Sequence, residues 1–308
     1  MLMGYSLADL GAIFAMQGFA GLVLFSVFVL MALGLAIIFG QMGVINMAHG
    51  EFMIIGAYVT FLVSRLFAAE LPGAFGLYFF LAIVLAFIVA GALGIVVEWL
   101  LIRHLYRRPL DTLLATWGLS LILQQIYRSI FGAREVGVEL PQWMMGSLHL
   151  TSAIEIPING LIVMAITAMI TAGVFYLIFR APWGLQVRAV MQNRAMAGAV
   201  GIDAERVDRL TFALGCGIAG VAGSAFTMMG STSPTAGQLY IVDTFLIVVF
   251  GGAQSLIGTI ASAFTISQAR STLEFFLSGS MAQVVVLLFV VSILMLRPQG
   301  LFVLKIRR

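Results

Sequence analysis

Charge is scarce in this sequence. Only 9% of the 308 residues are charged, while 62% are apolar. A water-soluble chain of this length cannot bury so much apolar surface, so the composition excludes a soluble globular domain and makes lipid the solvent. We expect membrane lipid, and no nucleic acid, among the partners of the chain.

Residues that carry common enzyme chemistry are also few. Lys305 is the only lysine, which excludes a Gly-Lys-Ser/Thr phosphate-binding loop, so any ATP must be hydrolysed by a different subunit. Cys216 is the only cysteine, which excludes an internal disulfide and a multi-cysteine metal site. His49, His104 and His149 are scattered, and neither a Gly-x-Ser-x-Gly elbow nor a His-Glu-x-x-His motif is present. We therefore expect no enzyme, no metal site and no cofactor bound by this chain.

Long apolar runs occupy most of the sequence. A helix needs about 20 mainly apolar residues to cross the hydrocarbon core, and a barrel strand would instead alternate over about ten residues. The runs are continuously apolar and rich in Gly and Ala, so they predict an all-α polytopic membrane protein with one transmembrane permease domain over 1–308. We count eight runs: 14–39, 52–67, 77–101, 113–126, 158–179, 210–229, 241–266 and 281–296.

Basic residues gather in three clusters. Short cytoplasmic loops of membrane proteins collect Lys and Arg, so we place all three clusters in the cytoplasm. The segment 134–155 carries three glutamates against one arginine, which suits the opposite side. The clusters are Arg103, Arg107 and Arg108; Arg180, Arg188, Arg194, Arg206 and Arg209, in a loop at about 180–209; and Arg297, Lys305, Arg307 and Arg308.

The order of the clusters conflicts with eight simple crossings. Three runs separate the second cluster from the third, which would bring the chain to the wrong side. The run 241–266 is interrupted by glycines and polar residues at 250–258, so we predict a broken or re-entrant helix there. Irregular backbone at membrane depth has to line protein or a cavity, which makes Gln254 and Ser255 candidates for a solute path. The alternative is a tightly packed glycine-rich helix.

A second break is predicted at 40–51. Three glycines weaken the helix, and Asn46, His49 and Glu51 are costly in hydrocarbon without partners. Discontinuous helices line solute paths in other transporters, so Asn46 and His49 are our second pair of path candidates. The alternative is a polar turn at the membrane surface, with Glu51 near the positive N-terminal end of the next helix.

Other polar residues fall inside the apolar runs. We expect most of them to pair between helices, and Arg270 precedes Glu274 by four residues on one helix face. The set is Glu98, Gln124, Gln125, Asp243, Gln268 and Glu274.

The basic loop at 180–209 has an amphipathic pattern. Apolar residues recur at helical spacing between about 184 and 201, while Arg188, Gln192 and Asn193 fall largely between them. This predicts a short cytoplasmic helix that docks on the membrane surface or on another protein. The alternative is a solvated loop of mixed charge.

Two stretches carry a family resemblance. The segment GLAIIFGQMGVINMAHGE at 34–51 resembles the N-terminal signature of permeases of branched-chain amino acid ABC importers, and LRPQGLF at 296–302 is similar to their C-terminal signature. Within that family, RRPLDTLLATWGLSL at 107–121 and QARSTLEFFLSGSMA at 268–282 look most like the B subunit of the urea importer. The resemblance covers nearly the whole chain.

The resemblance implies the partners and the location. The chain would sit in the bacterial inner membrane beside a second homologous permease, two cytoplasmic ATPases that use ATP, and a periplasmic solute-binding protein. In such importers a short cytoplasmic helix sits in a groove of the ATPase. The residues that would make this contact are Gly184, Val187, Val190, Met191 and Ala195.

The resemblance also implies the substrate. We expect a permease subunit of an ABC importer for urea or short-chain amides, because Asn46, His49, Gln254 and Ser255 suit hydrogen bonding to a neutral polar solute. Branched-chain amino acids are the same-class alternative. An autonomous secondary transporter or channel is the alternative from another class.

Overall fold

The computed structural model describes residues 7–106, 108–151, 154–297 and 300, and within them the chain is almost entirely helical. The all-α polytopic class is confirmed, since six helices are long and apolar enough to cross a membrane. The helices are α1 (Leu7–Met42), α2 (His49–Glu70), α3 (Tyr78–Leu100), α4 (Pro109–Phe131), α5 (Ile158–Phe179), α6 (Pro182–Gln192), α7 (Arg194–Ala199), α8 (Ala204–Phe226), α9 (Ala236–Gly251), α10 (Leu256–Phe276) and α11 (Gly279–Leu296). The shorter elements are the 3-10 turns η1 (Pro72–Leu77), η2 (Ile102–His104) and η3 (Gln142–Met144) and the antiparallel strands β1 (Ser147–Thr151) and β2 (Ile154–Pro157).

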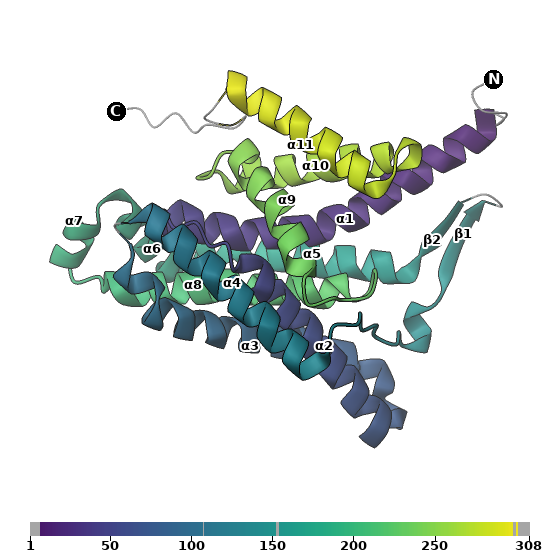
Figure 1. Cartoon of the computed structure of the whole chain (residues 1–308), viewed down its shortest axis with the longest axis horizontal. Coiled ribbons are helices and arrows are strands. Elements are labelled where there is room, and N and C mark those ends of the chain that lie inside the picture. The colour runs from purple at the N-terminus through teal and green to yellow at the C-terminus, as the bar shows by residue number, and fades with distance from the viewer. Residues whose placement is uncertain (1–6, 107, 152–153, 298–299, 301–308) are drawn as a thin grey trace.

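The long helices run between two ends of the molecule (Figure 1). One end, at the left of the view, carries α6 and α7 and the start of α4. The other end carries the first residues of α1 and the β1–β2 hairpin. The described residues of the basic loops at 103–108 and 180–209 therefore lie at the same end, and those of the acidic segment 134–155 lie at the other. That the α6–α7 end faces the cytoplasm stays a prediction.

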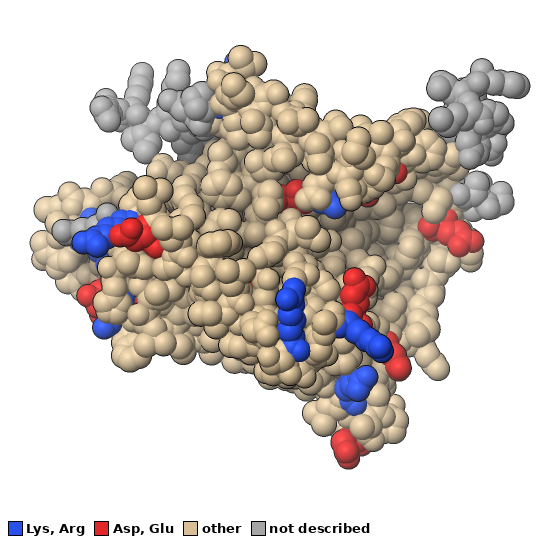
Figure 2. Space-filling model, viewed as in Figure 1, with Lys and Arg blue, Asp and Glu red and all other residues tan. Residues whose placement is uncertain are grey.

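In the space-filling view one group of charged side chains lies at the left, α6–α7 end, a small group lies near the upper centre, and the others lie from the middle to the lower right (Figure 2). An uncharged stretch of surface separates the left group from the others. Four basic residues of the predicted clusters, Arg107, Lys305, Arg307 and Arg308, lie outside the described residues.

The predicted break in the run 241–266 is confirmed. The chain leaves α9 through Gly252, whose φ of 92° is a left-handed conformation that suits glycine, and enters α10 after Ser255. The Ser255 hydroxyl oxygen accepts a hydrogen bond from the Gly258 backbone N–H at 3.0 Å, which caps the new helix. A continuous glycine-rich helix is therefore wrong. Four helices, α8 to α11, lie between Arg194 of the second basic cluster and Arg297 of the third, and of these α8 and α11 are long and apolar enough to span a membrane.

Helix α8 is the centre of the packing. It lies against α1, α2 and α3, and small residues let the backbones approach closely. A methyl group at Gly56 of α2 would overlap the Gly220 carbonyl oxygen of α8, and one at Gly34 of α1 would crowd the Gly215 carbonyl oxygen. Close packing of this kind holds helices together in lipid, where no hydrophobic force acts between them.

Helix α4 packs by a polar face. Thr112, Thr116, Ser120 and Gln124 recur every fourth residue and are all buried, whereas Trp117 on another face is exposed. The helix also extends at both ends beyond the predicted run 113–126. The predicted run was too short because the polar residues of the helix lower its mean hydropathy. Its polar face turns toward the break between α1 and α2.

Candidate solute path and coupling surface

The break between α1 and α2 lies inside the protein. Helix α1 ends at Met42, and Gly43 has a φ of 65°. The His49 ring then lies 3.1 Å from the Met31 carbonyl oxygen, about three turns back along α1. The first residue of α2 therefore contacts α1 well before its C-terminal end, so the chain folds back along α1 through the segment 43–48. Asn46 and His49 are both fully or almost fully buried, so this turn is enclosed by the protein rather than exposed.

Asn46 and His49 each use only part of their hydrogen-bonding capacity. The Asn46 side-chain oxygen accepts a bond from the Ala48 backbone N–H at 3.1 Å, which turns the chain into α2. The Met31 carbonyl can only accept, so the His49 Nε2 carries the hydrogen. Within the described part of the chain, Asn46 Nδ2 and His49 Nδ1 have no partner. A buried polar atom without a partner costs about 1–3 kcal/mol, so these two atoms are candidates for binding a ligand.

Glu51 is the functional candidate that the sequence reasoning missed. It lies in the first turn of α2 and is 1% exposed. Its Oε1 accepts hydrogen bonds from Ser120 Oγ at 2.9 Å and Gln124 Nε2 at 2.8 Å, while Oε2 has no partner among the described residues. The Tyr127 hydroxyl donates to the Glu51 backbone oxygen at 3.1 Å. Glu51 was counted among the costly polar residues of this stretch but was left out of the path candidates, yet its carboxyl group contacts the polar face of α4.

The polar face of α4 closes over this break. Thr116 Oγ1 accepts a hydrogen bond from the Met47 backbone N–H at 3.1 Å. About one turn and two turns further along α4, Ser120 and Gln124 donate to Glu51. The four-residue spacing of Thr112, Thr116, Ser120 and Gln124 is visible in the sequence and would have pointed to a buried polar face. The prediction that Gln124 pairs between helices is confirmed. Gln125, also expected to pair, is exposed.

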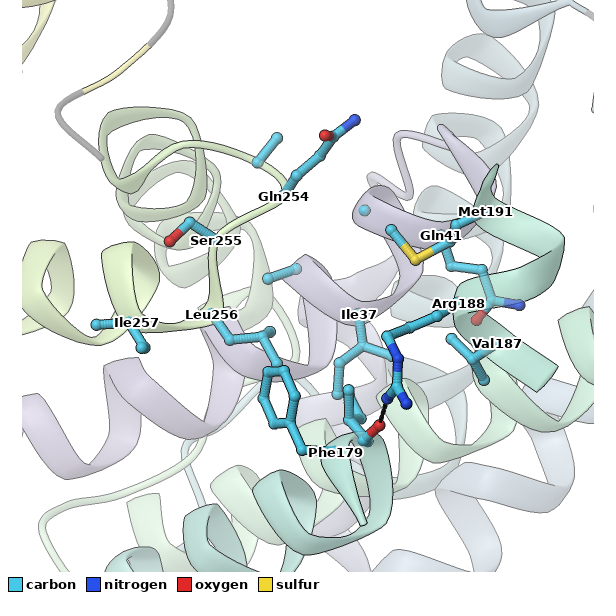
Figure 3. Close-up of a pocket in the computed structure, with 14 residues that line it drawn as sticks. Ile37, Gln41, Phe179, Val187, Arg188, Met191, Gln254, Ser255, Leu256 and Ile257 are labelled. Carbon is cyan, nitrogen blue, oxygen red and sulfur yellow. Dashed lines mark hydrogen bonds between the residues drawn. The ribbon is translucent and has the colours of Figure 1, made fainter. Parts of the chain in front are cut away.

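The other two predicted path residues lie elsewhere. Gln254 and Ser255 border a pocket of about 250 Å³ between the end of α1, the end of α5, helix α6 and the loop between α9 and α10 (Figure 3). Asn46 and His49 do not line it. Gln254 is exposed, and the Ser255 hydroxyl is engaged in capping α10. The structure therefore places the four residues in two groups: one in the core of the protein, one beside the amphipathic loop.

The amphipathic stretch folds as two helices, α6 and α7, joined at Asn193, so a solvated loop is wrong. The Asn193 side-chain oxygen accepts a bond from the Met196 backbone N–H at 3.0 Å and caps α7. Gly184 packs against the last carbonyl groups of α5, where a methyl group would overlap them. The Arg188 guanidinium donates to the Ile178 carbonyl oxygen in the same place, and Figure 3 marks this bond.

Part of the predicted coupling surface faces the protein itself. Val187 and Val190 are buried and pack with Ala197 and Val207. The prediction that Val187 and Val190 contact a separate subunit is therefore corrected. The side chains recur at helical spacing because they bind α6 to α7 and α8. Ala195 is exposed, and so are the larger apolar residues Leu185, Met191, Met196 and Val200.

A polar network ties this region to the long helices. Asp208 of α8 pairs with Arg194 of α7 and accepts a hydrogen bond from Gln41 of α1 at 3.2 Å. Next to it, the Tyr106 hydroxyl donates to Glu98 of α3 at 2.6 Å, and the Arg194 guanidinium lies over the Tyr106 ring. Burial, together with the bond to Glu98, holds the pKa of Tyr106 well above its ordinary value, so Tyr106 remains a neutral donor.

A second interhelical cluster joins α9, α10 and α11. Arg270 lies 2.6 Å from Asp243 and 3.0 Å from Glu274, and Gln283 donates to Asp243 at 3.2 Å. The predicted pairing of Arg270 with Glu274 is confirmed. These contacts bind the helices that surround the second break to one another.

A polytopic helical protein with a discontinuous pair of helices in its core, and a helical loop at the basic end, has the architecture of a membrane permease. The family described as "Branched-chain amino acid transport system / permease component" matches residues 18–296. The chain belongs to this family of transport permeases, which are multi-pass proteins of the inner membrane.

Curated relatives cover almost the full length. The high-affinity branched-chain amino acid transport system permease protein LivH of Salmonella typhimurium is 30% identical over 302 residues, which cover 94% of this chain and 95% of LivH. LivH of Escherichia coli strain K12 is also 30% identical, over 300 residues and the same shares. BraD of Pseudomonas aeruginosa, named for the same transport, is 26% identical over 91% of this chain and 93% of BraD. No solved structure matches the chain.

The comparisons confirm the family and not the substrate first expected. The named relatives are branched-chain amino acid permeases, and the urea importer that the sequence favoured has no support among them. The identification of the chain as a transport permease is unaffected by this difference in substrate.

Proposed function

We propose that the chain is the permease subunit of an ABC importer that takes up branched-chain amino acids. The observation that carries the proposal is the 30% identity to LivH along nearly the full length of both chains. We place the solute at the break between α1 and α2, where buried polar atoms have no partner in the described part of the chain.

The polar groups at the break suit a zwitterion. An ammonium group requires hydrogen-bond acceptors and benefits from a negative charge, and a carboxylate requires donors. Glu51 Oε2 is an acceptor and Asn46 Nδ2 is a donor, both buried and both without a partner in the described part of the chain. The expectation of a neutral solute left Glu51 out of the path. With Glu51 included, the path holds a group that can offset a charged end.

Helix α4 is the element that has to move in this proposal. Ser120 and Gln124 occupy one oxygen of Glu51, and the remaining oxygen faces no donor among the described residues. A solute that reaches Glu51 exchanges protein hydrogen bonds for its own, so little free energy is lost as α4 shifts.

Energy for the movement comes from partner subunits. We place a second homologous permease in the membrane, two ATPases at the α6–α7 end and a periplasmic solute-binding protein at the opposite end. The exposed apolar residues Leu185, Met191, Met196 and Val200 form the surface that an ATPase covers. The bonds from Arg194 to Asp208 and from Asp208 to Gln41 then carry the displacement to α8 and α1.

Urea is the second candidate. It is favoured by the resemblance of 107–121 and 268–282 to the urea importer subunit, and Ser120 in the first of these segments contacts Glu51. The unpartnered atoms also match a neutral diamide: Asn46 Nδ2 can donate to its carbonyl group, and His49 Nδ1 and Glu51 Oε2 can accept from its amino groups.

Uptake of labelled solutes separates the two. A strain that lacks both systems receives this gene with its second permease, ATPases and binding protein, and uptake of leucine and of urea is compared. We expect saturable leucine uptake that is lost when the ATPases are omitted. Urea uptake without leucine uptake would identify urea, and not an amino acid, as the substrate. Uptake of either solute by this chain alone would identify an autonomous transporter.

A further inference from the structure

A second pocket opens at the α6–α7 end, separate from the one beside Gln254. It has a volume of about 730 Å³ and lies where the turn between α3 and α4 meets the amphipathic loop. Among the described residues, its lining includes three arginines and one histidine but no Asp or Glu. The lining residues are Gln41, Met42, Arg103, His104, Tyr106, Arg108, Val190 and Arg194.

Two of the three arginines in the pocket are available for an external anion. Arg194 is committed to the buried Asp208, but Arg108 has only an exposed contact with Asp111 at 3.6 Å, which is worth little in water. Arg103 has no carboxylate within 4 Å in the described part of the chain, and its guanidinium lies over the Trp99 ring at 5.5 Å. His104 lies beside it, with its Nε2 at 3.4 Å from Arg103 Nε.

The neighbouring surface is apolar and faces outward. Trp99 and Leu100 at the end of α3, and Leu110 and Leu114 at the start of α4, are all about half exposed or more. Trp at this level is typical of the boundary between headgroups and hydrocarbon. A free anion would use the arginines and leave this surface uncovered, whereas a ligand with an anionic head and acyl chains covers both.

The geometry points to an anionic phospholipid, with its phosphate held by Arg103 and Arg108 and its chains against Leu100, Leu110 and Leu114. Basic pockets beside transmembrane helices on the cytoplasmic side bind such headgroups. Val190 and Arg194 form the opposite wall of the pocket, so the bound lipid joins the turn between α3 and α4 to the loop that carries α6 and α7.

Native mass spectrometry of the purified, delipidated chain tests the proposal, with phosphatidylglycerol and phosphatidylcholine of the same acyl chains as probes. We expect the wild type to retain phosphatidylglycerol preferentially. The double variant Arg103→Gln/Arg108→Gln should lower that preference by about 25-fold, which is about fivefold for each basic residue. Arg103→Lys keeps the charge and should keep most of the preference, and Arg128→Gln, an exposed arginine at the far end of α4, is the matched control.

Four results would overturn the proposal. Equal retention of the two lipids would show that the chain has no site selective for an anionic lipid. An unchanged preference in a double variant that elutes as a folded monodisperse protein would show that Arg103 and Arg108 do not form the site. Displacement of phosphatidylglycerol by millimolar inorganic phosphate would identify a site for a free anion. Displacement by the purified ATPase, with weaker ATPase binding in the double variant, would identify a protein contact in place of the lipid.

Discussion

The contact between Glu51 and Gln124 makes a quantitative prediction. Gln124 Nε2 donates to Glu51 Oε1 at 2.8 Å, and Glu51 is 1% exposed. Hydrogen bonds between membrane helices average about 0.6 kcal/mol, whereas a buried polar group that loses its partner costs about 1–3 kcal/mol. Gln124→Leu should therefore lower the free energy of unfolding by about 2 kcal/mol. Gln125→Leu, on the exposed side of the same helix, should change it by less than about 0.5 kcal/mol.

A double-mutant cycle isolates the contact. Unfolding of the purified protein by dodecyl sulfate in mixed micelles is measured for the wild type, Gln124→Leu, Glu51→Leu and the double variant. We expect a coupling energy of about 1.5 kcal/mol, because Glu51→Leu removes the acceptor of the Gln124 hydrogen bond. A coupling energy below about 0.3 kcal/mol, or equal losses in Gln124→Leu and Gln125→Leu, would refute the reasoning that α4 is held over the break by Glu51.

Three further predictions follow from packing, coupling and topology. Gly56→Val should prevent accumulation of folded protein, because the new side chain would overlap the α8 backbone. Gly118→Val, at a position with open space around it, should fold, and fluorescence-detected gel filtration measures both variants. Met196→Asp should reduce co-purification of the ATPases, since it adds a charge to an exposed apolar surface, and normal co-purification would place the contact elsewhere. Cysteine at position 194, in a chain carrying Cys216→Ser, should resist an impermeant thiol reagent added to intact cells; labelling would reverse the orientation.

The spans were largely predictable because hydropathy reports helix length. The run 158–179 coincides with α5, and the glycines at 250–258 predicted a break that Gly252 and Ser255 form. Helix α4 was shortened to 113–126, because its buried face is polar and a hydropathy average cannot tell a buried polar face from a solvated one.

The site was less predictable than the spans. Asn46 and His49 were chosen for their cost in lipid, and their burial agrees with that reasoning. Glu51 was missed because its partners, Ser120 and Gln124, are about seventy residues away in the sequence. Val190 was assigned to an external partner because periodicity shows which residues share a face, but not what covers that face.

The central claim is that solute crosses at the break between α1 and α2, and chemical modification at Asn46 tests it most directly. In the full transporter, Asn46→Cys in a chain carrying Cys216→Ser is treated with a small thiol reagent. The side chain is 1% exposed, so we expect reaction only during ATP-driven turnover, with loss of uptake and with protection by excess substrate. Full uptake after complete modification of the cysteine would contradict the claim.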